Sequence, residues 1–233
     1  MGKRIIQQRR GRGSLTYRVK KKAFRFRIGY PLEKGKAKII KLINSPAHSA
    51  PLMKLEINEK IFYGPAFEKA FEGQEIELND RAEKGDITRL KNVPIGKKVF
   101  NIESRPGDGG KMIRVSGSSA IITKKQAGKV GLVMPSRKEI FINEDCRATV
   151  GEIAGAGRLD KPVVKAGKKY HMKKSKSKLW PRTSAVAMNA IDHPFGSGRG
   201  KNVGSKIAKR NAPPGKKVGL LRPRKTGRKK GKR

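Results

Sequence analysis

The chain has 233 residues, with 58 Lys and Arg against 18 Asp and Glu, and a formal net charge of +40. So large a positive charge repels itself unless a polyanion neutralises it, and nucleic acid is the obvious polyanion. The single cysteine, Cys146, excludes an internal disulfide and a metal site made of cysteines alone. No apolar run reaches the length of a membrane span, and the start MGKRIIQQRRGRG lacks the apolar centre of a secretory signal.

The positive charge is concentrated at the two ends of the chain. Residues 1–35 carry 12 basic side chains and 1 acidic one, and residues 166–233 carry 22 and 1. Residues 36–165 are more balanced, with 24 basic and 16 acidic side chains. Since the ends are also poor in large apolar residues, burial there cannot offset the entropy of ordering the chain. We therefore predict two extended basic arms, 1–35 and 166–233, that become ordered on a partner.

Aromatic and basic residues alternate in the first arm, where Phe24, Phe26 and Tyr30 lie among Arg and Lys. This composition is typical of a segment that follows phosphates and stacks its rings on bases. The same stretch, 24–30, fits the first strand of the following domain equally well, and both interpretations stay open.

Residues 36–93 contain several short β patterns. We predict a strand over 37–43, a loop over 44–51, a hairpin over 52–63, one helical turn or a loop over 65–71, and a strand over 74–80. In the last strand, Ile76 and Leu78 alternate with Glu75 and Glu77, which places the apolar pair inward. Short strands packed this closely predict a small barrel, with an OB-like fold the preferred kind.

Residues 94–165 repeat the β pattern, with glycine-bearing turns between strands. We expect strands to begin near Val99, Lys111, Ala120, Lys129, Lys138 and Ala148. The expected core positions are Ile113, Val115, Ile121, Val130, Leu132, Ile140, Ile142, Val150 and Ile153. This segment predicts a second, SH3-like barrel. The fold class is therefore mainly β, with an OB-like barrel, an SH3-like barrel and two extended basic arms.

The C-terminal arm, 166–233, is interrupted by a stretch without Lys or Arg, TSAVAMNAIDHPFGSG (183–198). This stretch holds the only carboxylate of the arm, Asp192, next to His193. Pro194 fixes its own φ, and glycines at 196, 198 and 200 allow the backbone to approach a partner closely. We interpret residues 183–200 as a loop of defined shape with a contact surface of its own.

An enzyme that uses Asp192 and His193 is one alternative. Adjacent residues in an extended chain point to opposite sides, so the pair is badly placed to act as orienting group and base. His48, His171 and His193 also lack the spacing of metal ligands. We therefore predict no catalytic residue, no protein metal site and no cofactor, with any Mg²⁺ associated with the bound RNA.

A second glycine-rich stretch, RPGDGGK (105–111), lacks the spacing and the strand–helix context of a nucleotide-binding loop. A hairpin turn is one interpretation. We favour a barrel loop whose backbone comes close to RNA.

Seven stretches carry a family resemblance, in the same order as in that family. They are QRRGRG (8–13), NSPAHSAP (44–51), NIESRPGDGGK (101–111), CRATVG (146–151), DKPVVKAGKK (160–169), VAMNAIDHPFGSGRG (186–200) and RNAPPGKKVG (210–219). Together they make the chain resemble the universal large-subunit ribosomal protein two, in its archaeal and eukaryotic form, over essentially its whole length. Ser197 departs from the family, which usually has glycine there, and a serine disfavours a positive φ at this position.

The resemblance implies a structural, non-enzymatic constituent of the large ribosomal subunit, located in the cytoplasmic ribosome. It implies binding to large-subunit rRNA, contacts with neighbouring ribosomal proteins, and indirect effects on tRNA and the small subunit. It further implies that the 186–200 loop lies near the peptidyl transferase centre, where the RNA carries the chemistry. No membrane partner and no homo-oligomer are expected.

The predicted domains are an arm over 1–35, an OB-fold RNA-binding domain over 36–93, an SH3-like barrel over 94–165 and an arm over 166–233. The candidate rRNA-binding residues are Arg9, Arg10, Arg12, Arg105, Lys111, Arg158, Lys168, Lys169, Trp180, Met188, Asn189, Asp192, His193, Gly196, Gly198, Arg199, Arg210, Lys216 and Lys217. A chromatin-like protein that compacts DNA would share the basic ends, but two barrels with glycine-rich loops and little helix argue against it.

Overall fold

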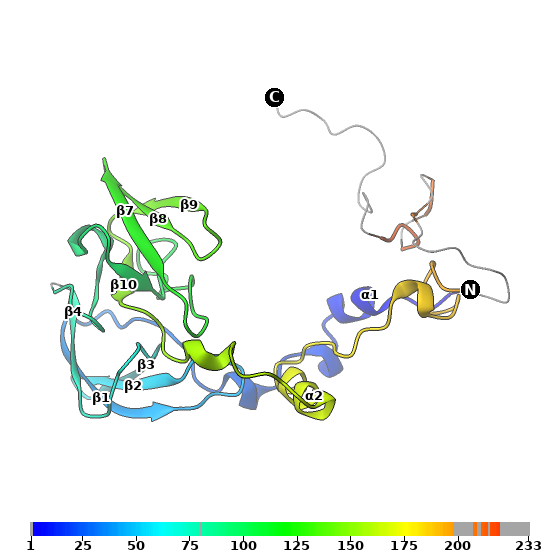
Figure 1. The fold of residues 1–233 in the computed structure, drawn as a ribbon, viewed down its shortest axis with the longest axis horizontal. Helices are drawn as coiled ribbons and strands as arrows, with labels where there is room; N and C mark the ends of the chain where they lie inside the picture. The colour runs from blue at the N-terminus through cyan, green and yellow to red at the C-terminus, as the bar shows by residue number, and fades with distance from the viewer. Residues whose placement is uncertain (1, 80, 198–206, 209–210, 214, 220–233) are drawn as a thin grey trace. The chain divides into compact units, whose positions relative to one another are not determined.

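The computed structural model describes residues 2–79, 81–197, 207–208, 211–213 and 215–219 (Figure 1). The chain divides into two compact units. Residues 19–176 form the first, which we call the β unit. Residues 1–18 and 177–233, from the two ends of the chain, form the second, which we call the terminal unit.

Within the described residues, the β unit is built on one sheet of ten strands in the order β3-β2-β1-β4-β5-β10-β6-β7-β8-β9. The strands are β1 Gly35–Ile43, β2 Leu52–Ile57, β3 Lys60–Pro65, β4 Glu75–Asn79, β5 Ile87–Arg89, β6 Lys98–Phe100, β7 Ala120–Gln126, β8 Lys129–Val133, β9 Glu139–Asn143 and β10 Arg147–Val150. Neighbours are antiparallel except β4 and β5. The predicted fold class, mainly β, is confirmed. The assignment of OB-like and SH3-like barrels and their boundaries stay predictions.

The β2–β3 hairpin forms as its sequence predicts. Ile57 pairs with Lys60, so only Asn58 and Glu59 make the turn. Both have positive φ, 46° and 63°, as a two-residue hairpin turn matching the strand twist requires. β3 is an edge strand, and the arm residue Ile28 forms an isolated parallel bridge to its Tyr63. The 24–30 segment therefore adds to the sheet edge over a single bridge rather than as a full strand.

Two hydrophobic clusters lie along the sheet. The first gathers Ala37, Ile39, Ala50, Met53, Leu55, Ile57, Ala66, Phe67, Ile76, Leu78, Ile87, Phe100 and Ile153. The second gathers Leu90, Val93, Val99, Ile102, Ala120, Ile122, Val130, Leu132, Ile142, Cys146, Ala148 and Val150. Ile76 and Leu78 point inward as predicted. Pro65 is the last residue of β3, and residues 66–71 form a loop in which Lys69 has positive φ.

Two expected core residues are exposed. Ile121 is 41 % exposed because the neighbouring Ala120 and Ile122, both fully buried, take the inward positions of β7. Val115 is 52 % exposed and lies outside the strands. The strand expected near Lys111 is reduced to an isolated bridge between Ile102 and Met112. Glycines at 107, 109 and 110 with positive φ precede it and interrupt the extended backbone.

Helical segments are short. The α-helices are α1 Ile6–Gly11 and α2 Ala166–Ser175, and the 3₁₀ helices are Leu15–Tyr17, Lys21–Phe24, Leu90–Asn92, Ala156–Arg158 and Ala185–Ala187. The two predicted arms, 1–35 and 166–233, therefore contain short helical segments as well as extended chain. The α2 segment, AGKKYHMKKS, consists largely of good helix formers with no proline. It buries no side chain, and a helix this short is marginal in water on its own.

The phase of β7 gives a matched test of the core. We expect Ile122→Ala to lower the free energy of unfolding by about 2–5 kcal/mol, because it leaves a cavity in a fully packed cluster. The adjacent Ile121→Ala makes the same chemical change on the exposed face and should cost less than about 1 kcal/mol. Denaturant unfolding of the two variants measures the difference. Equal losses of unfolding free energy would show that Ile121 and Ile122 do not face the exposed and buried sides of the sheet as described.

Candidate nucleic-acid interface

The two basic segments hold far more cations than their own carboxylates can neutralise. Residues 1–35 and 166–233 carry 34 Lys and Arg but only Glu33 and Asp192 as acids. Glu33 accepts a 2.6 Å hydrogen bond from Lys60, and Asp192 lies 3.6 Å from the Nζ of Lys3. Most of the positive charge of the arms is thus left for an external anion.

The stretch without Lys or Arg folds back on itself, and we call its described part, residues 183–197, the tail loop. Asn189 O accepts the amide hydrogens of Asp192 at 3.0 Å and of His193 at 3.2 Å. The amide of Ser197 donates to Met188 O at 3.1 Å, and Asn189 and Ser197 form a bridge. The predicted loop of defined shape therefore has an internal hydrogen-bond frame.

Gly196 is the tightest point of this frame. A Cβ at this position would lie 2.3 Å from Asn189 O, closer than two such atoms can approach. The closure of the loop therefore requires glycine at position 196 because a Cβ would clash there, and not because the backbone has a positive φ. Ser197, where glycine was expected from the resemblance, is not among the described residues with positive φ. The serine is compatible with the loop backbone.

His193 is held inside the tail loop. Its side chain is only 8 % exposed, and its ring meets that of Phe195 edge to face at 5.1 Å. The Phe195 amide donates to Nδ1 at 3.0 Å, so the neutral ring carries its proton on Nε2. Burial lowers the pKa of His193 below its ordinary value. At neutral pH the ring is therefore an uncharged hydrogen-bond donor.

The N-terminal residues pack on the tail loop, a contact that the sequence did not predict. The amide of Lys3 donates to Ile191 O at 2.7 Å. Ile5, Phe195 and Val218 form a small buried cluster, with Ala185 at its edge. The signal available in the sequence is weak: isolated apolar residues in otherwise basic or polar segments. Residues from both ends of the chain therefore share this small hydrophobic cluster.

The sequence-predicted site residues fall into three groups. In the terminal unit lie the α1 residues Arg9 and Arg10, with Arg12 directly after it, together with Trp180, Met188, Asn189, Asp192, His193, Gly196, Lys216 and Lys217. In the β unit, Lys168 and Lys169 are exposed on α2, and Arg105, Lys111 and Arg158 are exposed on loops or short turns. Gly198, Arg199 and Arg210 lie outside the described residues.

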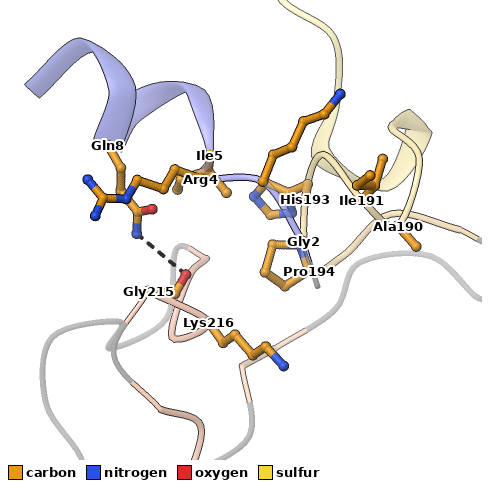
Figure 2. A pocket seen from close by; sticks show the side chains of 11 residues that line it. Gly2, Arg4, Ile5, Gln8, Ala190, Ile191, His193, Pro194, Gly215 and Lys216 are labelled. Carbon is orange, nitrogen blue, oxygen red and sulfur yellow. Dashed lines mark hydrogen bonds between the residues drawn. The ribbon is translucent and has the colours of Figure 1, made fainter. Parts of the chain in front are cut away.

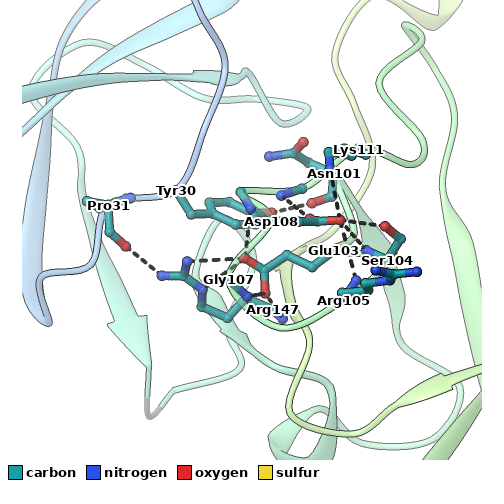
Figure 3. Close-up of polar contacts among 12 residues, drawn as sticks. Tyr30, Pro31, Asn101, Glu103, Ser104, Arg105, Gly107, Asp108, Lys111 and Arg147 are labelled. Carbon is teal, nitrogen blue, oxygen red and sulfur yellow. Dashed lines mark hydrogen bonds and ion pairs between the residues drawn. The ribbon is translucent and has the colours of Figure 1, made fainter.

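The glycine-rich loop 105–111 is held by two carboxylates from within (Figure 3). Glu103 is fully buried and accepts the amides of Gly107 at 3.2 Å and Gly109 at 3.1 Å. Asp108 accepts the amides of Ser104 at 3.1 Å and Gly110 at 3.1 Å. These amides are therefore not available to a phosphate. The predicted approach of this loop's backbone to RNA cannot use them as hydrogen-bond donors. The exposed side chains of Arg105 and Lys111 remain the groups that can bind an anion there.

Glu103 also pairs with Arg147. The guanidinium Nη2 of Arg147 lies 3.1 Å from Oε1, and the Arg147 amide donates to Oε2 at 2.9 Å. The same guanidinium donates to Pro31 O at 2.5 Å and lies over the ring of Tyr30 (Figure 3). One buried ion pair thus joins the glycine-rich loop, β10 and the chain that leads into β1.

The carboxyl of Asp108 is stabilised in its charged form. Burial alone would raise its pKa, but hydrogen bonds from Ser104 and Gly110 and the charge of Lys111 outweigh burial and lower the pKa.

Among the described residues no group of three or more His, Cys, Asp or Glu side chains could hold a metal ion. Within the same ranges, the helices are too short and too polar to cross a bilayer.

Comparison with known proteins identifies relatives over nearly the whole chain. Residues 83–214 match the family described as Ribosomal Proteins L2, C-terminal domain. Large ribosomal subunit protein uL2 of Archaeoglobus fulgidus is 46% identical, over 97% of this chain and 99% of the relative. The uL2 protein of Methanocorpusculum labreanum is 44% identical, over 97% of this chain and 99% of the relative. The uL2 protein of Korarchaeum cryptofilum is 43% identical, over 99% of this chain and 97% of the relative.

The buried Glu103 gives a stability prediction. Glu103→Gln keeps the shape but removes the charge opposite Arg147 and replaces one acceptor oxygen by a donor. We expect a loss of about 3–5 kcal/mol in the free energy of unfolding. Glu75→Gln is the matched control, since Glu75 is exposed and lies 3.9 Å from Lys36, and it should change stability by less than about 1 kcal/mol. A similar, small effect of both variants would contradict the structural role of Glu103.

The hydrogen bond to His193 Nδ1 gives a pH prediction. Because the pKa is lowered in the folded loop, the neutral ring stabilises the terminal unit above the ordinary value of 6.5, and this contribution is lost as pH falls through the lowered pKa. The Phe195 amide resonance should therefore shift in a single titration below pH 6.5. The shift should vanish in His193→Ala. A Phe195 resonance that ignores pH in this window would rule out the hydrogen bond.

Proposed function

The chain belongs to the family of large ribosomal subunit protein uL2, and from this premise we propose that it binds large-subunit rRNA through its arms and its loops. It is a structural constituent of the large subunit in the cytoplasmic ribosome. The observation that carries the proposal is the excess of basic residues in the arms. In the C-terminal arm these residues flank, along the sequence, a folded tail loop that has no Lys or Arg.

The two kinds of surface suit two kinds of contact. Exposed Lys and Arg on α1, α2 and the 105–111 loop would neutralise phosphates, and each such contact contributes to a salt-dependent affinity. The tail loop, with its neutral His193 and closed backbone, would instead contact RNA by shape and hydrogen bonds. The first type positions the protein and the second fixes its register on the RNA.

The role of α2 follows from its lack of buried side chains. A ten-residue helix that buries no side chain gains little stability from tertiary packing. Its Lys168, Lys169, Lys173 and Lys174 would meet phosphates once the helix lies against RNA. Binding would then supply the stability that the isolated helix lacks.

The finer part of the proposal concerns translation. The protein would support subunit assembly, subunit association, tRNA placement and the geometry of the peptidyl transferase centre, with peptide-bond chemistry carried by the RNA. Neighbouring ribosomal proteins would be further partners. Mg²⁺ near the protein would be held by rRNA phosphates and not by the chain. The tail loop is the segment to which we assign the support of this geometry.

Sedimentation tests the large-subunit assignment, and one substitution tests the finer role in translation. Tagged chain should follow the large subunit through gradients at low and high magnesium, and its absence from that fraction would refute the large-subunit assignment. His193→Ala should leave the β unit folded, because His193 lies in the terminal unit. At equal incorporation it should slow peptide-bond formation in reconstituted subunits.

The control for His193→Ala is Lys229→Gln with Lys230→Gln, which removes two charges from the distal tail. This variant should weaken rRNA binding through the loss of phosphate contacts and leave the rate of peptide-bond formation in occupied subunits unchanged. If the two variants reduce binding and rate to the same extent, the tail loop has no role beyond its charge environment.

A further inference from the structure

A pocket of about 430 Å³ opens in the terminal unit where three segments meet (Figure 2). Residues 2–5 form one side, the tail loop at 190–194 forms another, and residues 215–216 close the third. Its volume lies within the range of about 300–1,000 Å³ that small-molecule sites occupy. None of the sequence-based candidates included the N-terminal side of this pocket.

The walls of the pocket are positively charged. Lys3, Arg4 and Lys216 line it, and none of the described carboxylates does. Lys3 is partly compensated by Asp192 at 3.6 Å. Arg4 and Lys216 are exposed, and neither forms an ion pair within the described part of the chain. The pocket therefore favours an anion, and an Arg with a Lys is a frequent combination for phosphate.

His193 adds a neutral donor to the same pocket. Its Nδ1 is occupied by the Phe195 amide, so Nε2–H is the polar group that the ring has left to offer. His193 lines the pocket, and its Nε2–H is not one of the buried unpaired atoms in the described part of the chain, so it can donate to a ligand that accepts it. Phosphate, ribose and base oxygens all accept such a bond.

The rest of the wall is apolar. Ile5, Ile191 and Pro194 line the pocket beside the cations. A bare phosphate or a single carboxylate would leave this surface uncovered, whereas a nucleotide combines an anion with a base whose flat faces are largely apolar. The mixture of walls and the volume together fit one nucleotide better than an acidic side chain.

We propose that this pocket binds a single nucleotide of RNA, with the phosphate against Arg4 and Lys216 and the sugar or base against Ile5, Ile191 and Pro194. The N-terminal residues are thus part of the RNA-contacting surface of the tail loop. The inference rests on the proposed function, since it places the pocket on bound rRNA, and it names a contact that rRNA binding by the chain as a whole does not require.

The test uses large subunits that contain the full-length chain. Ultraviolet cross-linking with mass spectrometry identifies the nucleotide joined to residues 2–5 or 190–194, and hydroxyl-radical footprinting then measures its protection. Ala190→Trp fills the exposed rim of the pocket without changing any charge. Ala187→Trp is its control, an equally exposed alanine outside the pocket. Arg4→Gln with Lys216→Gln removes the anion-binding pair, and Lys36→Gln with Lys38→Gln removes the same charge from exposed positions of β1.

We expect protection of the cross-linked nucleotide to fall about tenfold in both pocket variants and less than about twofold in both controls. Cross-links from the pocket to a neighbouring protein, or equal effects of pocket and control variants, would overturn the inference. In either case cross-links from other parts of the chain to rRNA would leave the proposed function standing. A chain without any cross-link to rRNA would refute both.

Discussion

Three carboxylates of this strongly basic chain, Glu103, Asp108 and Asp86, each accept two or more backbone amides. Glu103 is buried beside Arg147 and accepts amides from the glycine-rich loop. Asp108 closes the same loop from the other side, and Asp86 accepts the amides of Glu77 and Glu83. These acidic groups thus hold segments of the β unit together by accepting backbone amides.

The elements of the β unit follow largely from local pattern. The β2–β3 hairpin and the inward pair Ile76 and Leu78 were predictable, because strand alternation and turn chemistry act over a few residues. The phase of β7 was not, since Ile121 and Ile122 are chemically identical and only the sheet decides which one is buried. The three-residue strand β5 pairs with two strands but has too few residues to show alternation.

The candidate site was predictable in part. The absence of Lys and Arg marked the tail loop, and Gly196 is indeed confined by Asn189. The role of Ile5 was hidden, because a lone apolar pair in a basic segment carries no periodicity, and its partners Phe195 and Val218 lie near the opposite end of the chain. Similarly, the sequence marked the 105–111 glycines as functional, but not that Glu103 and Asp108 already occupy their amides.

The joining of the two chain ends also has a consequence for the order of folding. Gln8 donates a hydrogen bond to Gly215, 207 residues away, so the contact is among the most non-local that this chain can form. During synthesis the residues of the β unit are all made before Phe195 and Val218. The N-terminal segment therefore lacks these two partners until they have been added to the chain. The terminal unit is therefore the last part to form, and a truncated product lacks it however well the β unit folds.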